Sequence, residues 1–116
     1  MRNEQKFVIK LRKKAFACCT DEFEGELLFK TYCASCHSPT DKVLVGPGLQ
    51  GLTSKYSMEW LIQFTQNSPK MIKEGDSKAV KSYERYNKVI MPAQRLTEEE
   101  VEKIFKYVDS LEEDLL

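Results

Sequence analysis

Membrane-spanning and β-sheet patterns are both missing from this sequence of 116 residues. No run approaches the roughly 18 consecutive apolar residues that a membrane-spanning helix needs. No segment alternates apolar and polar residues as a half-buried strand does, and no internal repeat or low-complexity tract is present. The length suits one domain with a modest core, in which a large buried cofactor could supply much of the interior. These absences leave a single all-α domain as the expected fold class.

The sequence also lacks a net charge, because 18 basic side chains balance 18 acidic ones. The two signs are unevenly distributed. Residues 1–20 hold six Lys or Arg and one Glu, which leaves 12 basic and 17 acidic side chains in residues 21–116. Eight of the acidic residues fall within 97–116. A body that is mildly acidic argues against nucleic acid as a partner.

Four segments have the pattern of amphipathic helices. Acidic residues gather at the start of the first, where the helix dipole favours them, and Asp76 is placed to cap the third. The last is the clearest, because Thr97 and Glu100 form a capping box and apolar residues then recur at helical spacing. The expected helices are Asp21 to about Cys33, Ser57–Asn67, Asp76–Tyr86, and the segment after Thr97 that includes Val101, Ile104, Phe105, Val108 and Leu111.

The segment 38–56 contains Ser38-Pro39 and Gly46-Pro47-Gly48 and is predicted to be a loop. A loop of this length is unusual in so small a domain unless it encloses something. The expectation is therefore a helical domain whose long loops wrap a cofactor.

Cysteine is scarce but concentrated, and two of the four cysteines belong to the unit Cys33-Ala34-Ser35-Cys36-His37. A tetrahedral zinc site needs four ligands, whereas this unit supplies three, and Cys18 and Cys19 lie in the basic N-terminal segment. A thioredoxin-like dithiol belongs at a strand-to-helix junction, and no strand is predicted. Covalent c-type haem attachment uses both thiols as thioethers and the adjacent histidine as an axial iron ligand. Because His37 is the only histidine, no Ser–His–Asp or Cys–His catalytic set is predicted.

An iron held by His37 needs a second axial ligand or an open position, and methionines are candidates. Met91 precedes Pro92, which favours extended backbone that presents a side chain to a cofactor. Met58 lies on a helical stripe and is expected in the core. Met71, predicted to lie in a loop, is a rival ligand. Ordinary core packing is the alternative role for Met91.

Further residues extend the pattern on both sides of the cysteine–histidine unit. They are Gly25, Phe29, Gly46-Pro47-Gly48-Leu49-Gln50-Gly51, Met91-Pro92, and Leu96-Thr97-Glu98-Glu99-Glu100 leading to Tyr107. In this order the sequence resembles a small class I (monohaem) bacterial cytochrome c over about residues 21–111.

The resemblance implies a small cytochrome c fold of four to five helices, with long loops wrapped around one covalently attached haem c per chain. Cys33 and Cys36 would hold the haem vinyl groups. His37 would be the proximal iron ligand and Met91 the distal one.

Supporting roles also follow from the resemblance. The carbonyl of Pro47 would accept a hydrogen bond from the proximal histidine ring, and Leu49 would pack on the haem. Tyr56 and Trp60 would donate hydrogen bonds to the haem propionates, with a core aromatic as the alternative role for Trp60. In the same way, Gly25 and Phe29 would let the first helix cross the last closely near Tyr107.

An iron held on both sides has no free position for substrate, so the resemblance implies a one-electron carrier and not an enzyme. It would be a monomer that docks transiently with respiratory partners, such as a terminal oxidase. Two alternatives stay open: a ligand-binding or sensor haem protein with a labile distal methionine, and the haem subunit of a larger redox enzyme. Charge steering of partners is a hypothesis, with solvated surface charge as the plainer explanation. It is based on Lys42, Lys55, Lys70, Lys73 and Lys88.

Residues 1–20 lie outside the resemblance and are set apart from the cytochrome c domain at 21–116. Their apolar run is too short for a secretory signal, although Ala15-Phe16-Ala17-Cys18 faintly resembles a lipoprotein cleavage site. The segment is interpreted as a basic arm, or as a remnant or altered signal or lipoprotein leader. Bacterial thioether attachment is made outside the cytoplasm, so the resemblance implies a periplasmic or extracytoplasmic location. If Cys18 is lipidated, the domain is tethered to a membrane face.

Overall fold

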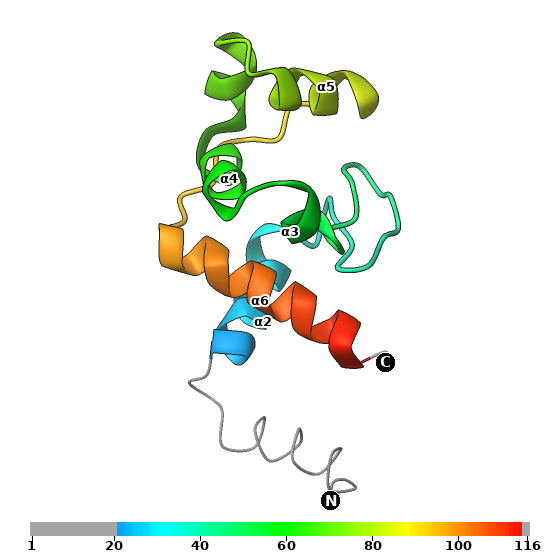
Figure 1. Ribbon diagram of the computed structural model, residues 1–116, viewed down its shortest axis with the longest axis vertical. Helices are drawn as coiled ribbons and strands as arrows, with labels where there is room; N and C mark the ends of the chain where they lie inside the picture. The colour runs from blue at the N-terminus through cyan, green and yellow to red at the C-terminus, as the bar shows by residue number, and fades with distance from the viewer. Residues whose placement is uncertain (1–20, 115–116) are drawn as a thin grey trace, which may run out of the picture.

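The computed structural model describes residues 21–114, with side chains from 22 to 111. These residues form helices and no strand, which confirms the all-α prediction (Figure 1). The helices are α2 (Asp21–Tyr32), α3 (Leu52–Lys55), α4 (Met58–Lys73), α5 (Ser77–Arg85) and α6 (Glu98–Asp114). None of them combines the length and the apolar composition that a membrane crossing would require. The predictions made for residues 1–20 lie outside the described part of the chain.

The first and last helices cross in close contact, as predicted from Gly25 and Phe29 (Figure 1). A β-carbon at Gly25 would overlap the carbonyl oxygen of Lys103 and lie 2.9 Å from Cβ of Tyr107. One turn further on, the ring centroids of Phe29 and Tyr107 are 5.8 Å apart in a tilted arrangement. An ion pair between Lys103 and Glu24 joins the same two helices. Contact along α2 therefore depends on having no side chain at residue 25.

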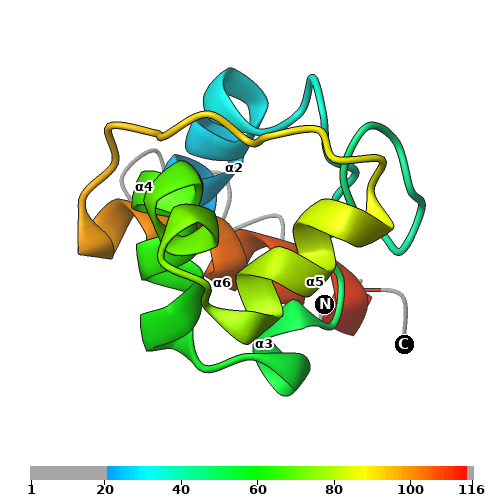
Figure 2. The same cartoon turned by 90° about the horizontal axis from the view of Figure 1, so that it is seen from above.

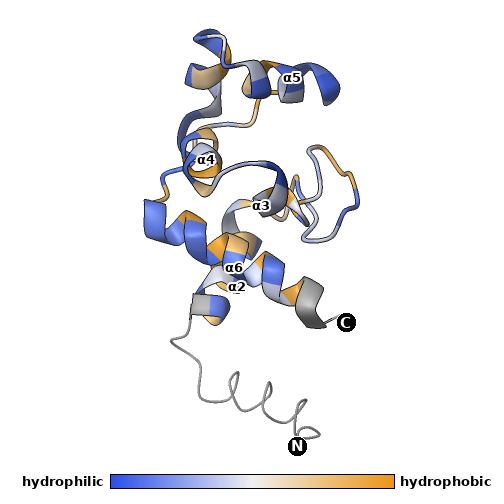
Figure 3. Cartoon of the chain, viewed as in Figure 1, coloured by the Kyte–Doolittle hydropathy of each residue, from blue (hydrophilic) through white to orange (hydrophobic). Residues whose placement is uncertain are grey.

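Helix α6 contributes several side chains to the buried core. Its capping box is confirmed, because Thr97 N–H donates to Glu100 Oε1 at 2.9 Å and Glu100 N–H donates to Thr97 Oγ1 at 3.1 Å. Four of its predicted apolar residues are buried, namely Val101, Ile104, Phe105 and Val108. Figure 3 shows α6 with both hydrophobic and hydrophilic residues along its length, as an amphipathic helix requires. Burial of one apolar stripe fixes this helix against α2 and α4.

The predicted loop at 38–56 is present for most of its length but contains the one-turn helix α3. Residue Gly51 precedes it with φ of 82°, a left-handed conformation that glycine adopts without strain. The loop folds back on itself, because Gly46 N–H donates to Cys36 O and Leu49 N–H donates to Ser38 O, each at 2.9 Å. A single turn is too short to show periodicity, so the sequence pattern missed α3.

Helix α4 begins where predicted, with the Ser57 hydroxyl accepting from Trp60 N–H at 3.1 Å. It does not end at Asn67, however, but breaks there and continues to Lys73. Asn67 has non-helical torsions, and its side chain accepts from Lys70 N–H at 3.3 Å, which starts a second segment. The prediction that Met71 lies in a loop was wrong, because this second segment contains it.

Helix α5 is capped by Asp76, as predicted, through a 2.9 Å bond from Ala79 N–H. After α5 the chain reverses at Asn87 and Lys88, both of which have positive φ. Residues 87–97, here called the strap, then run without helix to the start of α6. Figure 2 shows the strap crossing the molecule from the end of α5 to α6. Strap residues 89–92 line one cavity together with residues of α5 and of the loop that follows α2.

Candidate haem site

The cysteine–histidine unit lies at the end of α2, where the chain closes a tight turn. The carbonyl of Cys33 accepts from both Cys36 N–H at 3.1 Å and His37 N–H at 2.9 Å. Helix α2 itself ends at Tyr32, within a residue of the prediction. Because this turn is compact, the three side chains of the unit reach one cavity, which all of them line. That arrangement is the one that covalent haem attachment requires.

The two thiols occupy different environments. Cys33 is buried and Cys36 is half-buried, and no disulfide joins them. Burial, reinforced by the neighbouring Cys36, raises the pKa of the Cys33 thiol to about 11. A reactive redox dithiol needs the opposite, a lowered pKa that supplies thiolate near neutral pH. Together with the lack of strands among the described residues, this argues against the thioredoxin-like interpretation.

The zinc interpretation also finds no support in the described part of the chain. No three side chains among its His, Cys, Asp and Glu residues converge in a way that could hold a metal ion. Cys33, Cys36 and His37 therefore do not form the beginning of a tetrahedral site. Cys18 and Cys19 lie outside the described residues.

His37 is held in one orientation by the loop around Pro47. Its Nδ1 donates to the Pro47 carbonyl at 2.7 Å, which confirms the predicted hydrogen bond. A β-carbon on Gly46 would lie 2.5 Å from Cε1 of the ring, so the backbone packs directly against the imidazole. Burial lowers the pKa of His37, although the Pro47 hydrogen bond opposes that shift. A neutral ring with Nδ1 donating leaves Nε2 free to act as a metal ligand.

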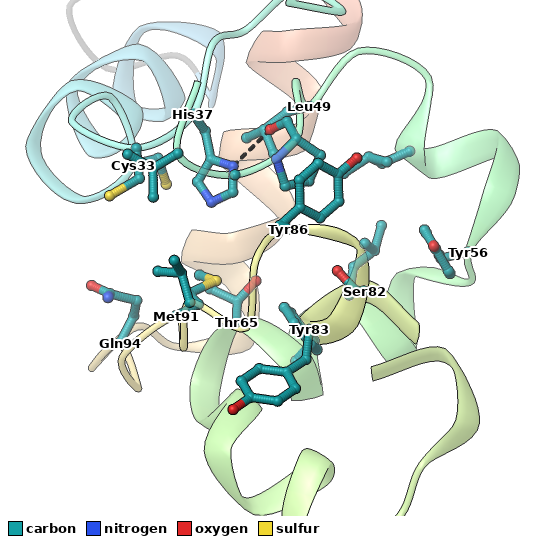
Figure 4. Close-up of a pocket in the computed structure, with 18 of the residues that line it drawn as sticks. Cys33, His37, Leu49, Tyr56, Thr65, Ser82, Tyr83, Tyr86, Met91 and Gln94 are labelled. Carbon is teal, nitrogen blue, oxygen red and sulfur yellow. Dashed lines mark hydrogen bonds between the residues drawn. The ribbon is translucent and has the colours of Figure 1, made fainter. Parts of the chain in front are cut away.

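Met91 lies on the opposite wall of the cavity from His37. Figure 4 shows the His37 ring directed into the open space and the Met91 side chain on the facing side, with Cys33 at the edge. Met58 and Met71 do not line this cavity, so Met91 is the single methionine of residues 21–114 that does. The structure thus favours Met91 over Met71 as the candidate ligand, a choice that the sequence left open.

The cavity has a volume of about 400 Å³, within the range of small-molecule and cofactor pockets. Its inner wall is apolar and includes Leu49, which is buried as expected for a residue that packs on the haem. Leu61, Ile104 and Phe105 form the same wall from α4 and α6. An apolar cavity lined by an imidazole, a thioether and two thiols fits a haem in its chemistry.

The predicted propionate ligands Tyr56 and Trp60 also line the cavity, in a stack that includes Phe64. The ring centroids are 4.5 Å apart for Tyr56 and Trp60, and 4.9 Å apart for Trp60 and Phe64. The indole N–H of Trp60 donates to Asp76 Oδ2 at 2.9 Å, so its one donor is engaged in this structure. A hydrogen bond from Trp60 to a propionate therefore stays a prediction, as does one from Tyr56.

Several residues in or beside the cavity were not predicted from the sequence to belong to the site, although Lys55 was named in the steering hypothesis. Three cations, Lys55, Lys81 and Arg85, line the cavity, and no described carboxylate does. This charge suits an anionic group, and haem carries two propionates. Ser68 was also missed, although it is fully buried beside the strap and donates to the Met91 carbonyl. The Asn-x-Pro sequence at 67–69 was a usable signal, because Asn caps helices and Pro favours their first turn.

Comparison with known proteins finds similar sequences and similar folds. The Cytochrome c family model matches residues 23–112. The fold is similar to cytochrome c from Rhodothermus marinus, with a TM-score of 0.70 and 26% identity over 81% of this chain and 78% of that one. An engineered form of that protein, Rma TDE, gives a TM-score of 0.68, 26% identity, and coverage of 80% and 78%. The cytochrome c domain of the pp3183 protein from Pseudomonas putida gives 0.63 and 32% identity, with coverage of 72% and 83%. A search of curated proteins found no match.

Fold and site together define a small helical haem protein of the c type. The chain belongs to the cytochrome c family. Its cofactor is therefore covalently attached haem c with its iron, which is what the sequence resemblance implied.

Proposed function

We propose that this cytochrome c is a one-electron carrier in which His37 and Met91 hold the haem iron from opposite sides. The observation that carries the proposal is their placement on facing walls of one cavity that no other described methionine lines. Cys33 and Cys36, at the cavity edge, would provide the two thioether links. Haem iron with two protein ligands exchanges single electrons between its ferric and ferrous states.

The chain's own residues support this role by keeping the site rigid and dry. The Pro47 carbonyl fixes the His37 ring, and Gly46 allows the backbone to cover it. The buried side chains of Leu49, Leu61 and Ile104 exclude water from the inner wall. Burial in an apolar shell and a thioether ligand both favour a fairly positive reduction potential.

The test is an optical spectrum of the purified holoprotein in both oxidation states, for wild type and Met91→Ala. We expect haem to remain attached after denaturation, and the weak Met-to-ferric-iron band to be present in wild type and absent in Met91→Ala. Met58→Ala and Met71→Ala are matched controls that should keep the band, because neither side chain lines the cavity. A band that survives Met91→Ala but disappears in Met71→Ala would refute the ligand assignment.

Carbon monoxide distinguishes the carrier from a ligand-binding or sensor protein. A carrier with a firm Met91 ligand should bind carbon monoxide weakly in the reduced state, whereas Met91→Ala should bind it readily. Ready binding by the wild type would favour the sensor alternative. Co-purification with a catalytic subunit would favour the enzyme-subunit alternative.

For partners we propose other redox proteins, such as a terminal oxidase or another respiratory complex, which dock transiently at the cavity mouth. Val89 and Ile90 line the cavity and are about half exposed, which suits a small apolar contact patch. Lys55, Lys81 and Arg85 give the mouth a positive charge that would attract an acidic partner surface. The proposed location is periplasmic or extracytoplasmic. Cell fractionation of the wild type and Cys18→Ser would test both that location and a lipid tether.

A further inference from the structure

Helix α4 is broken where it runs beside the strap. Asn67 leaves helical torsions at φ −163° and ψ 69°, and Pro69 follows two residues later. Proline has no N–H, so Pro69 cannot donate to the carbonyl four residues earlier, that of Thr65. The break therefore leaves one buried backbone acceptor of α4 without its helical partner.

The strap supplies the missing partner. Gln94 N–H donates to the Thr65 carbonyl at 3.1 Å, in place of the bond that Pro69 cannot make. A second hydrogen bond comes from the next residue of α4, where the Gln66 side-chain Nε2 donates to the Leu96 carbonyl at 2.9 Å. Both bonds join helix α4 to extended chain that has no secondary structure of its own.

A third hydrogen bond joins the break in α4 to Met91 itself. Ser68 lies in the break with no exposed surface, and its hydroxyl donates to the Met91 carbonyl at 2.6 Å. Pro92 restricts Met91 to extended backbone, so a fixed carbonyl also fixes the direction of the Met91 side chain. An unpaired buried hydroxyl or carbonyl would cost free energy, and this pairing therefore favours one strap position.

We propose that the break in α4 is the anchor that sets the axial methionine, with Ser68 as a positioning residue for Met91. The proposal rests on the proposed function, because it assumes that Met91 binds iron. A thioether is a soft ligand that binds ferric iron less firmly than ferrous iron. In the ferric state the strap must then supply the order that the metal bond does not, and the ties from Ser68 and Thr65 supply it.

The experiment measures how easily exogenous imidazole displaces Met91 from the ferric holoprotein. In Ser68→Ala we expect imidazole affinity to rise about fivefold, the factor that corresponds to about 1 kcal/mol for one hydrogen bond. Pro69→Ala is a second, independent variant. It introduces an N–H that competes with Gln94 for the Thr65 carbonyl. Like Ser68→Ala, it should therefore raise the affinity for imidazole.

Thr53→Val is the matched control for general loosening. It removes a hydroxyl that donates to Asp109 at 3.0 Å and joins α3 to α6, away from the strap. We expect it to lower the melting temperature by an amount similar to Ser68→Ala while leaving imidazole affinity at the wild-type value. An equal rise in Thr53→Val would overturn the proposal, because any loosening would then free Met91.

Met91→Ala, measured in parallel, separates the two proposals. If the wild type lacks the Met-to-iron band, or Met91→Ala keeps it, the proposed ligation fails. If ligation holds but Ser68→Ala and Pro69→Ala bind imidazole as the wild type does, only the anchor fails. Should Ser68→Ala not fold, Pro69→Ala alone decides, and an unchanged affinity there overturns the anchor.

Discussion

Gly25 of α2 lies directly against the backbone of Lys103 in α6, so closely that a β-carbon at residue 25 would overlap the Lys103 carbonyl. This contact sets the distance between the first and last helices. It also places Phe29 against Tyr107 and brings the end of α2, with Cys33, to the edge of the cavity. The position of the haem-attachment unit thus depends on a residue two turns away.

Gly25→Ala should destabilise the holoprotein by about 1–3 kcal/mol, because overpacking a close contact costs about that much. Helix propensity alone predicts the opposite sign, since alanine is favoured over glycine by about 1 kcal/mol within a helix. Chemical denaturation at neutral pH decides between them. Glu22→Ala, at an exposed position of the same helix, should cost less than about 1 kcal/mol, because it loses only the favourable interaction with the helix dipole.

Gly46→Ala should disturb the proximal histidine. The new β-carbon would approach Cε1 of His37 to 2.5 Å, so the ring must rotate and strain its 2.7 Å bond to Pro47. We expect shifted resonances of the His37 ring protons in paramagnetic NMR, together with an altered reduction potential. Gly75→Ala, where nothing lies within 4 Å, should cost about 1–2 kcal/mol for its positive φ and leave the haem signals unchanged. Wild-type ring shifts in Gly46→Ala would contradict this account.

Asp76→Ala should destabilise the fold by about 1–2 kcal/mol. It removes the α5 cap to Ala79 N–H and also the acceptor for the Trp60 indole, both at 2.9 Å. Asp76→Asn retains an acceptor oxygen and should lose less. Equal losses in the two variants would show that the charge, and not the hydrogen bonds, matters.

Asp76 should also contribute to the acid limb of the stability profile. The Trp60 hydrogen bond, followed by the one from Ala79 N–H, lowers the pKa of this carboxyl. A lowered folded-state pKa gives stability that is present above the unfolded value and is lost as pH falls through the folded value. The difference in stability between wild type and Asp76→Asn should therefore shrink below about pH 4. A difference that stays constant into acid would argue against the assigned pKa direction.

Lys81→Glu should slow electron transfer to an acidic redox partner several-fold at low ionic strength. Lys81 is exposed and lines the cavity mouth, where charge steers the approach of a partner. The effect should fade as salt shortens the Debye length below about 10 Å. Lys30→Glu changes net charge equally on a helix surface that does not line the cavity, and it should have a smaller effect. Rates that do not depend on salt would remove the steering hypothesis.

Local signals in the sequence predicted most of the helices. The capping box at Thr97 and the cap at Asp76 are determined by residues three positions apart, so they were readable without a fold. Helix α3 and the second segment of α4 were missed because each is shorter than two turns. Met71 was misplaced for that reason.

By itself, the sequence determined the chemistry of the site, because Cys33, Cys36 and His37 lie within five consecutive residues. Their separation is therefore set by the covalent chain and does not depend on the fold. The sequence also predicted that the long loop at 38–56 encloses a cofactor. Only the tertiary structure decided which methionine faces His37, and that Ser68 and Thr65 hold its strap. Those relationships join residues more than twenty positions apart, and packing brings them together where no local pattern encodes them.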